Sequence, residues 1–169
     1  MSRSVRWRPP PPDMVKINFD GTIFPNRNIA SLRIIIYNDY GLVMATLSQQ
    51  IPLPTSVEMV EVLAARRALL FARELGFESL VVEGDSEIII KAINGGGTML
   101  LSEFGHILHD IHSLVSSFQS VSFQHVRRLG NCVAHRLARR SFCNSFLVWM
   151  ESIPLNIFGI YNYDLSLVS

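Results

Sequence analysis

The chain has 169 residues, of which 49% are hydrophobic and 17% are charged. A composition this apolar excludes an intrinsically disordered chain, and the length suits one folded domain with a sizeable core. The formal net charge of +1 excludes a strongly basic surface over the whole molecule, so a nucleic-acid-binding surface would have to be local.

The cysteines and the N-terminal stretch indicate where in the cell the protein is expected. Cys132 and Cys143 lack the spacing of a metal site or a redox motif, which favours reduced thiols in an intracellular protein, either nuclear or cytoplasmic. The N-terminal stretch has no apolar signal core, and no segment reads as a membrane span. We expect a monomer that does not interact with membranes.

The chain begins with a proline-rich segment, "RWRPPPPDM". Four consecutive prolines favour an extended polyproline conformation, so residues 1–14 are predicted to be a leader or linker. The folded domain is predicted over residues 15–143, with a C-terminal tail over residues 144–169.

The first part of the domain reads as β-structure. Apolar residues alternate with polar ones in "VKINFDG" (15–21), and two further runs cover residues 31–39 and 42–51. Gly41 and the Asn-Asp-Tyr before it supply turn chemistry between the second and third runs, which predicts a hairpin. The three strands together predict an antiparallel meander.

Helices and strands then alternate. Residues 56–77 have helical periodicity, with Ser56 as the predicted cap and Gly76 as the end. Further elements are predicted as a strand over 79–85, helices from 86 and over 104–118, a strand over 120–126 and a helix over 131–142. A meander followed by such crossovers predicts an α/β fold, a mixed sheet with helices on its faces.

One acid lies on the packing face of the helix at 56–77. At about 100° per residue, Val57, Ala65 and Ala68 fall within roughly 40° of Glu61. A lone carboxylate on such a face is costly unless a cation or a hydrogen-bond donor meets it. Glu61 is therefore a candidate functional residue.

Two further acids follow strands. Asp85 either caps the next helix or lies at the C-terminal end of a strand, where open α/β sheets bind ligands. Asp20 is either a turn residue before Gly21 or another site residue. A shared divalent cation would explain all three acids, since carboxylate oxygens suit Mg²⁺ or Mn²⁺, and two such ions can drive phosphodiester hydrolysis.

Four blocks in order, "KINFDG", "VEVLAARRALLFARELGF", "VVEGDSEIIIKAI" and "HVRRLGNCVAHRLARRS", resemble the type 1 ribonuclease H domain. More narrowly, they resemble the reverse-transcriptase-like, retroelement-derived domains of plants, over residues 15–142. The resemblance implies a ribonuclease H-like fold with a five-stranded mixed sheet: three antiparallel strands, then parallel strands, flanked by helices. It also implies endonucleolytic cleavage of the RNA strand of an RNA–DNA hybrid, with two Mg²⁺ (or Mn²⁺) ions held by Asp20, Glu61 and Asp85.

The chain departs from that family in three places. His135 replaces the fourth acid, and it is a ligand for Mn²⁺, a proton shuttle, or only an exposed helix residue. The loop before the last helix is short and lacks the histidine that helps product leave in many relatives. Relatives carry glycines at the start of the second strand, where this chain reads "NIASLR".

Basic residues lie around the predicted last helix. The candidate nucleic-acid contacts are Arg127, Arg128, Arg136, Arg139 and Arg140. The alternative is a solvated face with favourable charge near a helix C-terminus. Asn131 is predicted to cap this helix, and the resemblance also places it near the hybrid.

Three functions stay open from the sequence. The first is a metal-dependent hybrid ribonuclease, impaired to an unknown degree by His135. The second is a catalytically weak, retroelement-derived domain that still binds nucleic acid. The third is a protein-interaction domain that uses the surface of the fold and its apolar tail.

Overall fold

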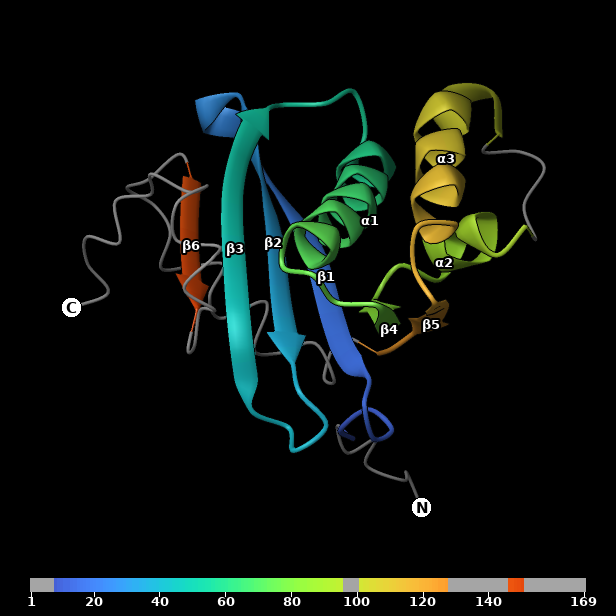
Figure 1. The fold of residues 1–169 in the computed structure, drawn as a ribbon. Helices are drawn as coiled ribbons and strands as arrows, with labels where there is room; N and C mark the ends of the chain where they lie inside the picture. Colours follow the sequence, from blue (N-terminus) through green and yellow to red (C-terminus); the bar gives the residue numbers. More distant parts are fainter. Residues whose placement is uncertain (1–7, 96–100, 128–145, 151–169) are drawn as a thin grey trace, which may run out of the picture.

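The computed structural model describes residues 8–95, 101–127 and 146–150. Its elements, shown in Figure 1, are β1 (Val15–Phe24), a short 3-10 turn (Pro25–Arg27), β2 (Ile29–Tyr37), β3 (Val43–Pro52), α1 (Val57–Glu74), β4 (Ser79–Gly84), α2 (Glu87–Ile93), α3 (Leu101–Val115), β5 (Ser120–His125) and β6 (Phe146–Met150). The predicted helix over residues 131–142 lies outside the described residues.

The strands form one mixed sheet in the order β5-β4-β1-β2-β3-β6. β1, β2 and β3 pair antiparallel, whereas β4 runs parallel to β1 and β5 runs parallel to β4. The predicted five-stranded mixed sheet is therefore confirmed. β6, which falls in the predicted tail, adds an antiparallel strand beside β3.

The hairpin between β2 and β3 forms where the turn residues predict it. The Asn38 side chain accepts hydrogen bonds from the backbone N–H groups of Tyr40 and Leu42, at 3.0 and 2.9 Å. Gly41 has a φ of 79°, a conformation that glycine adopts without steric cost. Local side-chain bonds and one glycine thus reverse the chain between two apolar strands.

β1 is longer than its sequence pattern predicts. It continues through Asp20 and Gly21 to Phe24, and the chain reverses only afterwards, in the turn at Pro25–Arg27. The interpretation of Asp20 as a turn residue is therefore wrong, because Gly21 and the residues after it stay paired with β2.

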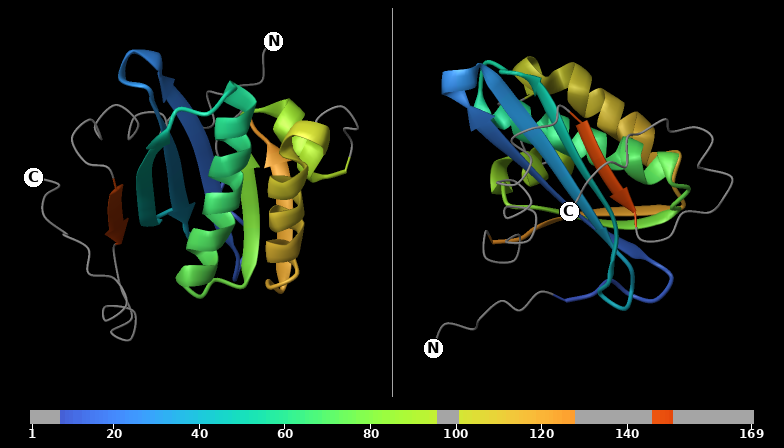
Figure 2. Two further views of the ribbon diagram at one scale, coloured as in Figure 1. Left: turned by 90° about the horizontal axis from the view of Figure 1, so that it is seen from above. Right: turned by 90° about the vertical axis from the view of Figure 1, so that its left-hand side faces the viewer.

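The helices described here cover one face of the sheet. α1 packs on β1 and β2 and against α3, and α2 packs on β5 (Figures 1 and 2). Residues such as Ile17 and Phe19 face this layer and are fully buried, as are Leu69 and Leu80. Alternation along β1 sends Lys16, Asn18 and the other even-numbered residues toward the opposite face.

α1 begins and ends where its sequence signals predict. The Ser56 side chain accepts a hydrogen bond from the Met59 backbone at 3.2 Å, and Gly76 has a φ of +80° just beyond the helix. The histidines of α3, His106, His109 and His112, are exposed, so they do not form a buried cluster. No helix in the described part of the chain is long and apolar enough to cross a membrane.

Candidate metal centre

Asp20 lies inside β1, at the level where the strand passes the start of α1. Its Oδ1 accepts a hydrogen bond from the backbone N–H of Gly21 at 2.9 Å, and the residue is 6% exposed. The strand therefore holds this carboxylate in a fixed and largely dry position, because both its backbone and its side chain are hydrogen-bonded within the sheet.

Glycine at position 21 lets α1 approach β1 closely. A Cβ atom there would lie only 2.4 Å from Cγ1 of Val60, a separation that atoms in contact do not adopt. Glu61 follows Val60 in the helix and is also 6% exposed. The missing side chain thus brings the Glu61 carboxylate, predicted to face the packing side of the helix, into the neighbourhood of Asp20.

Asp85 follows β4 directly and stands just before α2. The helix cap is Ser86, whose side chain accepts a hydrogen bond from the Ile89 backbone at 3.4 Å, so the interpretation of Asp85 as the cap is wrong. A Cβ atom at Gly84 would lie 2.5 Å from the ring of Phe19. The end of β4 therefore packs closely against Phe19 of the core, and Asp85 follows directly after the strand.

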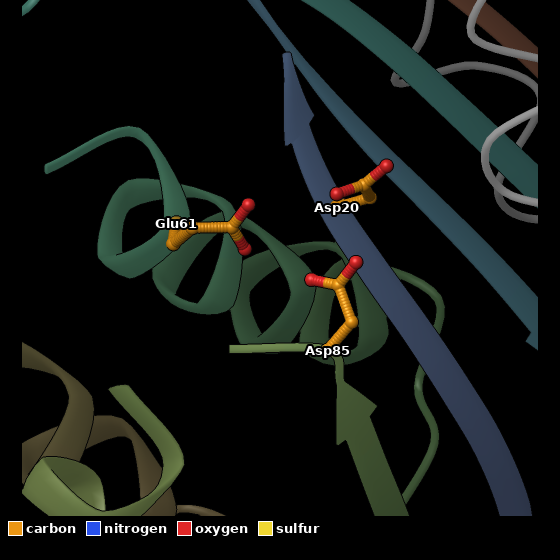
Figure 3. Close-up of side chains that lie close together, drawn as sticks. All are labelled: Asp20, Glu61 and Asp85. Carbon is orange, nitrogen blue, oxygen red and sulfur yellow. The ribbon is translucent and has the colours of Figure 1, made fainter. Parts of the chain in front are cut away.

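The three acids lie together. Each acid offers one carboxylate oxygen, and these three oxygens, from Asp20, Glu61 and Asp85, lie within 4.8 Å of one another. Figure 3 shows the three side chains converging from β1, α1 and the end of β4. Three carboxylates so close repel one another unless a cation neutralises them. Oxygen ligands at this separation fit a hard divalent cation such as Mg²⁺ or Mn²⁺.

A cleft of about 520 Å³ opens beside the acids. Its lining residues include all three acids together with Thr22, Glu58 and Ser86. Val57 and Ile88 also line it and are 51% and 56% exposed. The prediction that Val57 packs inward is wrong, because Val57 is half exposed and lines the cleft.

The sequence interpretation missed a cation beside the acids. Arg33 of β2 stands directly opposite Asp20 in the antiparallel register and is 2% exposed. Burial lowers the pKa of Arg33 from its usual value to about 10, and the negative charge of Asp20 opposes this shift. A charged residue inside the apolar run "SLRIIIY" was the available signal.

A histidine adjacent to the site was also missed. Nε2 of His125, the last residue of β5, lies 3.2 Å from the backbone oxygen of Asp85. The pKa of Glu87 is lowered mainly by the hydrogen bond from Lys91 and by the charge of Lys91. His125 makes a smaller electrostatic contribution to the same shift. β5 therefore places an imidazole against the backbone of one of the three acids.

Several predicted site residues lie outside the described residues, namely Arg128, Asn131, His135, Arg136, Arg139 and Arg140. Arg127 is described and is exposed, immediately after β5. The roles assigned to these residues from the sequence stay predictions.

Comparison with protein families and curated proteins gives two matches. The model of a family described as reverse transcriptase-like matches residues 18–141. The uncharacterized protein YpeP of Bacillus subtilis (strain 168) is 26% identical over 141 residues, which is 80% of this chain and 62% of that protein. The chain therefore spans somewhat less than two thirds of this curated relative.

Solved structures share the fold. RNase H1 from the halophilic archaeon Halobacterium salinarum NRC-1 has a TM-score of 0.68 at 24% identity, over 73% of this chain and 93% of that one. The N-terminal RNase H domain of a Mycobacterium tuberculosis protein, solved as a fusion, has a TM-score of 0.66 at 22% identity, over 73% and 89%. LC11-RNase H1, solved in complex with an RNA/DNA hybrid, has a TM-score of 0.58 at 24% identity, over 73% and 92%.

Proposed function

Because this chain belongs to the reverse transcriptase-like family and has a ribonuclease H-like fold, we propose that it is a metal-dependent nuclease that hydrolyses the RNA strand of an RNA–DNA hybrid. The single observation that carries this proposal is the cluster of Asp20, Glu61 and Asp85 beside an open cleft. A fold neighbour solved with an RNA/DNA hybrid supports the choice of substrate. The protein would act as a monomer.

In this proposal the carboxylates hold the catalytic cations. Two divalent ions, Mg²⁺ or Mn²⁺, would supply activation of the attacking water and stabilisation of the departing 3′ oxygen. Asp20, fixed within β1, a strand in the interior of the sheet, would ligate both ions. Glu61 would hold one ion from α1, and Asp85 would orient the other from the end of β4.

Recognition of the hybrid would rest on the shape of its minor groove. The 2′-hydroxyl groups of an RNA strand line a wide, shallow groove, which the open cleft suits. Arg127, Arg128 and Arg139 would contact phosphates, and Asn131 would lie near the hybrid while capping its helix.

His135 would stand where relatives carry a fourth acid. An imidazole is a poor ligand for Mg²⁺ and a better one for Mn²⁺, so we expect Mn²⁺ to support faster cleavage than Mg²⁺. The second candidate function, a catalytically weak, retroelement-derived nucleic-acid-binding domain, is favoured by this replacement and by the buried cation at Arg33.

A cleavage assay tests the proposal. The substrate is an RNA–DNA hybrid labelled on the RNA strand, assayed in Mg²⁺ and in Mn²⁺, with single-stranded RNA and duplex DNA as control substrates. Replacement of Asp20→Asn should lower the Mn²⁺-supported rate by roughly 100-fold, since it removes a negative charge from the ion site. Replacement of His135→Asp should raise the Mg²⁺-supported rate.

The outcomes separate the two candidates. Cleavage of hybrid that Asp20→Asn leaves unchanged would contradict the proposed nuclease. Binding of hybrid without cleavage in either metal, by both the parent and the His135→Asp variant, would favour the binding domain. Equal Mg²⁺-supported rates for the parent and His135→Asp would show that position 135 does not limit catalysis.

A further inference from the structure

We propose that Arg33 is a built-in counter-cation of the Asp20 carboxylate, so that the acidic cluster of the protein without nucleic acid binds at most one divalent ion, and binds it weakly. This inference rests on the proposed function in that it takes the cluster of Asp20, Glu61 and Asp85 to be a metal centre. It adds a residue from β2 that controls how many ions the cluster takes.

The sheet register places Arg33 beside Asp20. The two residues are directly opposed on the antiparallel strands β1 and β2, and the pairing is regular on both sides, with Phe19 opposite Ile34 and Gly21 opposite Leu32. Directly opposed residues project their side chains from the same face, with Cβ atoms about 5 Å apart. The guanidinium therefore shares its face of the sheet with the carboxylate.

Burial makes this pairing energetically important. Arg33 is 2% exposed and is among the largest fully buried side chains, while Asp20 is 6% exposed. A buried guanidinium is costly unless an opposite charge compensates it. The pKa of Arg33 is about 10, lowered by burial and supported by the charge of Asp20, so the group stays protonated at neutral pH.

The charge balance of the cluster follows from this geometry. Three ionised carboxylates carry three negative charges, and Arg33 supplies one positive charge next to one of them. The remaining two negative charges are balanced by a single divalent cation. A second divalent cation would face net repulsion until the phosphates of a nucleic acid bring further negative charge into the cleft.

Arg33 belongs to a segment in which the sequence departs from its relatives. The segment "NIASLR", where glycines are expected from the resemblance, here ends in a long cationic side chain. On β3 the residue paired with Arg33 is Ser48, which is neutral and also buried. Among the directly paired neighbours of Arg33, the negative charge thus comes from Asp20.

Direct metal binding tests the inference without using activity. Mn²⁺ is titrated into the metal-free protein in the absence of nucleic acid, and free Mn²⁺ is measured by electron paramagnetic resonance. Replacement of Arg33→Met, which keeps the apolar stem and removes the charge, should tighten Mn²⁺ binding roughly tenfold or more and allow a second ion to bind. Arg33→Lys, which keeps the charge, should bind like the parent.

Two further variants serve as controls. Arg73→Met removes an exposed arginine from the end of α1 and should leave Mn²⁺ binding at the parent value. Glu61→Gln should abolish binding in the parent and in the Arg33→Met background. If Glu61→Gln binds Mn²⁺ like the parent, the cluster is not a metal centre and the proposed function itself fails.

Other results bear on Arg33 alone. Parent-like affinity and stoichiometry in Arg33→Met, with binding still abolished by Glu61→Gln, would overturn the inference and leave the proposed function standing. If circular dichroism shows that Arg33→Met is unfolded, Arg33→Gln replaces it in the comparison with Arg33→Lys. If both uncharged variants stay unfolded even with Mn²⁺, Arg33 maintains the fold instead of tuning the ion site, and the inference is likewise overturned.

Discussion

At the scale of single residues, the sheet face opposite the helices contains a buried ion pair. Nζ of Lys16 lies 2.9 Å from Oε1 of Glu83, and the two side chains are 8% and 5% exposed. Asn18 donates to the other carboxylate oxygen of Glu83 at 3.5 Å, and Lys16 also donates to the backbone oxygen of Arg8. Each charge is therefore compensated locally, which is the condition for burying it.

Replacement of Lys16→Met should destabilise the protein strongly. The Glu83 carboxylate would stay buried without its cation, and we expect the free energy of unfolding to fall by about 3–5 kcal/mol, measured by urea denaturation. The double variant Lys16→Met, Glu83→Leu should recover most of that loss, because both charges are then gone.

The exposed ion pair of α2 provides the control. Lys91 and Glu87 are 2.9 Å apart on the helix surface, with side chains 65% and 60% exposed. Replacement of Lys91→Met should leave the urea midpoint unchanged within error. A comparable loss in Lys16→Met and Lys91→Met would show that burial does not govern the strength of these pairs.

At the scale of elements, the contact between α1 and β1 sets the geometry of the acidic cluster. Gly21 has no Cβ atom to hold the helix away, and Val60 fills the space that a side chain would take. Because Glu61 is the next residue of α1, its distance from Asp20 depends on how closely this helix approaches the strand. Packing and metal binding are therefore coupled at Gly21.

Replacement of Gly21→Ala should weaken both the packing of α1 on β1 and the binding of metal by the acidic cluster. The added methyl group would have to push Val60 and the α1 backbone away, at a cost of about 1–3 kcal/mol in unfolding free energy. Mn²⁺ affinity should fall at the same time, because Glu61 moves with the helix. The measurements are urea denaturation and Mn²⁺ titration of the same samples.

Gly105→Ala is the matched control. Gly105 lies inside α3, and a Cβ atom there meets nothing within 4 Å. We expect it to stabilise the protein by roughly 0.5–1 kcal/mol through helix propensity, with unchanged Mn²⁺ affinity. Loss of stability with retained Mn²⁺ affinity in Gly21→Ala would contradict the coupling.

At the scale of the whole molecule, pairing of strands from distant parts of the chain assembles the site. β4 runs parallel to β1 although some 50 residues separate them in sequence. The end of β4 therefore lies beside Asp20, with Asp85 just beyond it, and α1 supplies Glu61 over the same edge. Global unfolding should accordingly abolish metal binding in one step.

The alkaline stability of the molecule provides a further prediction. Burial, together with the charge of Glu83, raises the pKa of Tyr37 from 10.0 to about 12. The folded state therefore holds the proton of the Tyr37 hydroxyl more tightly than the unfolded chain does. The contribution of this protonated hydroxyl to stability is complete below pH 10 and is lost as the pH rises to about 12. Replacement of Tyr37→Phe should flatten this decline, a difference of up to about 2 kcal/mol.

The measurement is the urea midpoint as a function of pH from 9 to 12. Arg33 has the opposite effect on stability over part of this range. Its pKa is lowered by burial, so it loses its proton in the folded state first, and this loss removes the cost of burying a charge. Both Tyr37→Phe and the parent contain Arg33, so the comparison between them cancels this effect. Tyr40, which is 84% exposed, supplies the control, and Tyr40→Phe should follow the parent curve. Parallel curves for all three proteins would contradict the assignment to Tyr37.

Much of the fold could be predicted because its signals are local. Alternating apolar residues predicted the strands, and Ser56 and Gly76 marked the ends of α1. The turn at Asn38 and Gly41 was readable for the same reason, since its hydrogen bonds connect residues within four positions of each other. Such features depend on neighbours in the sequence, so the sequence shows them directly.

The finer assignments around the acids needed the structure. Asp20 lies within a strand and not at its end, Ser86 and not Asp85 caps α2, and Val57 lines the cleft. Spacing alone cannot decide which of two adjacent residues caps a helix, and it cannot show that the first residue of α1 lines a cleft. The pairing of β1, the hydrogen bond to the Ser86 side chain and the position of Val57 in the cleft decided between the alternatives.

The sequence by itself determined the strand and helix order and the three acids worth attention, because periodicity and the cost of a buried carboxylate are properties of short stretches of chain. Only the tertiary structure decided that Asp20, Glu61 and Asp85 share one cleft, and that Arg33 and His125 lie beside them. The physical reason is that these neighbours meet through sheet register and helix packing, which join residues that are distant along the chain.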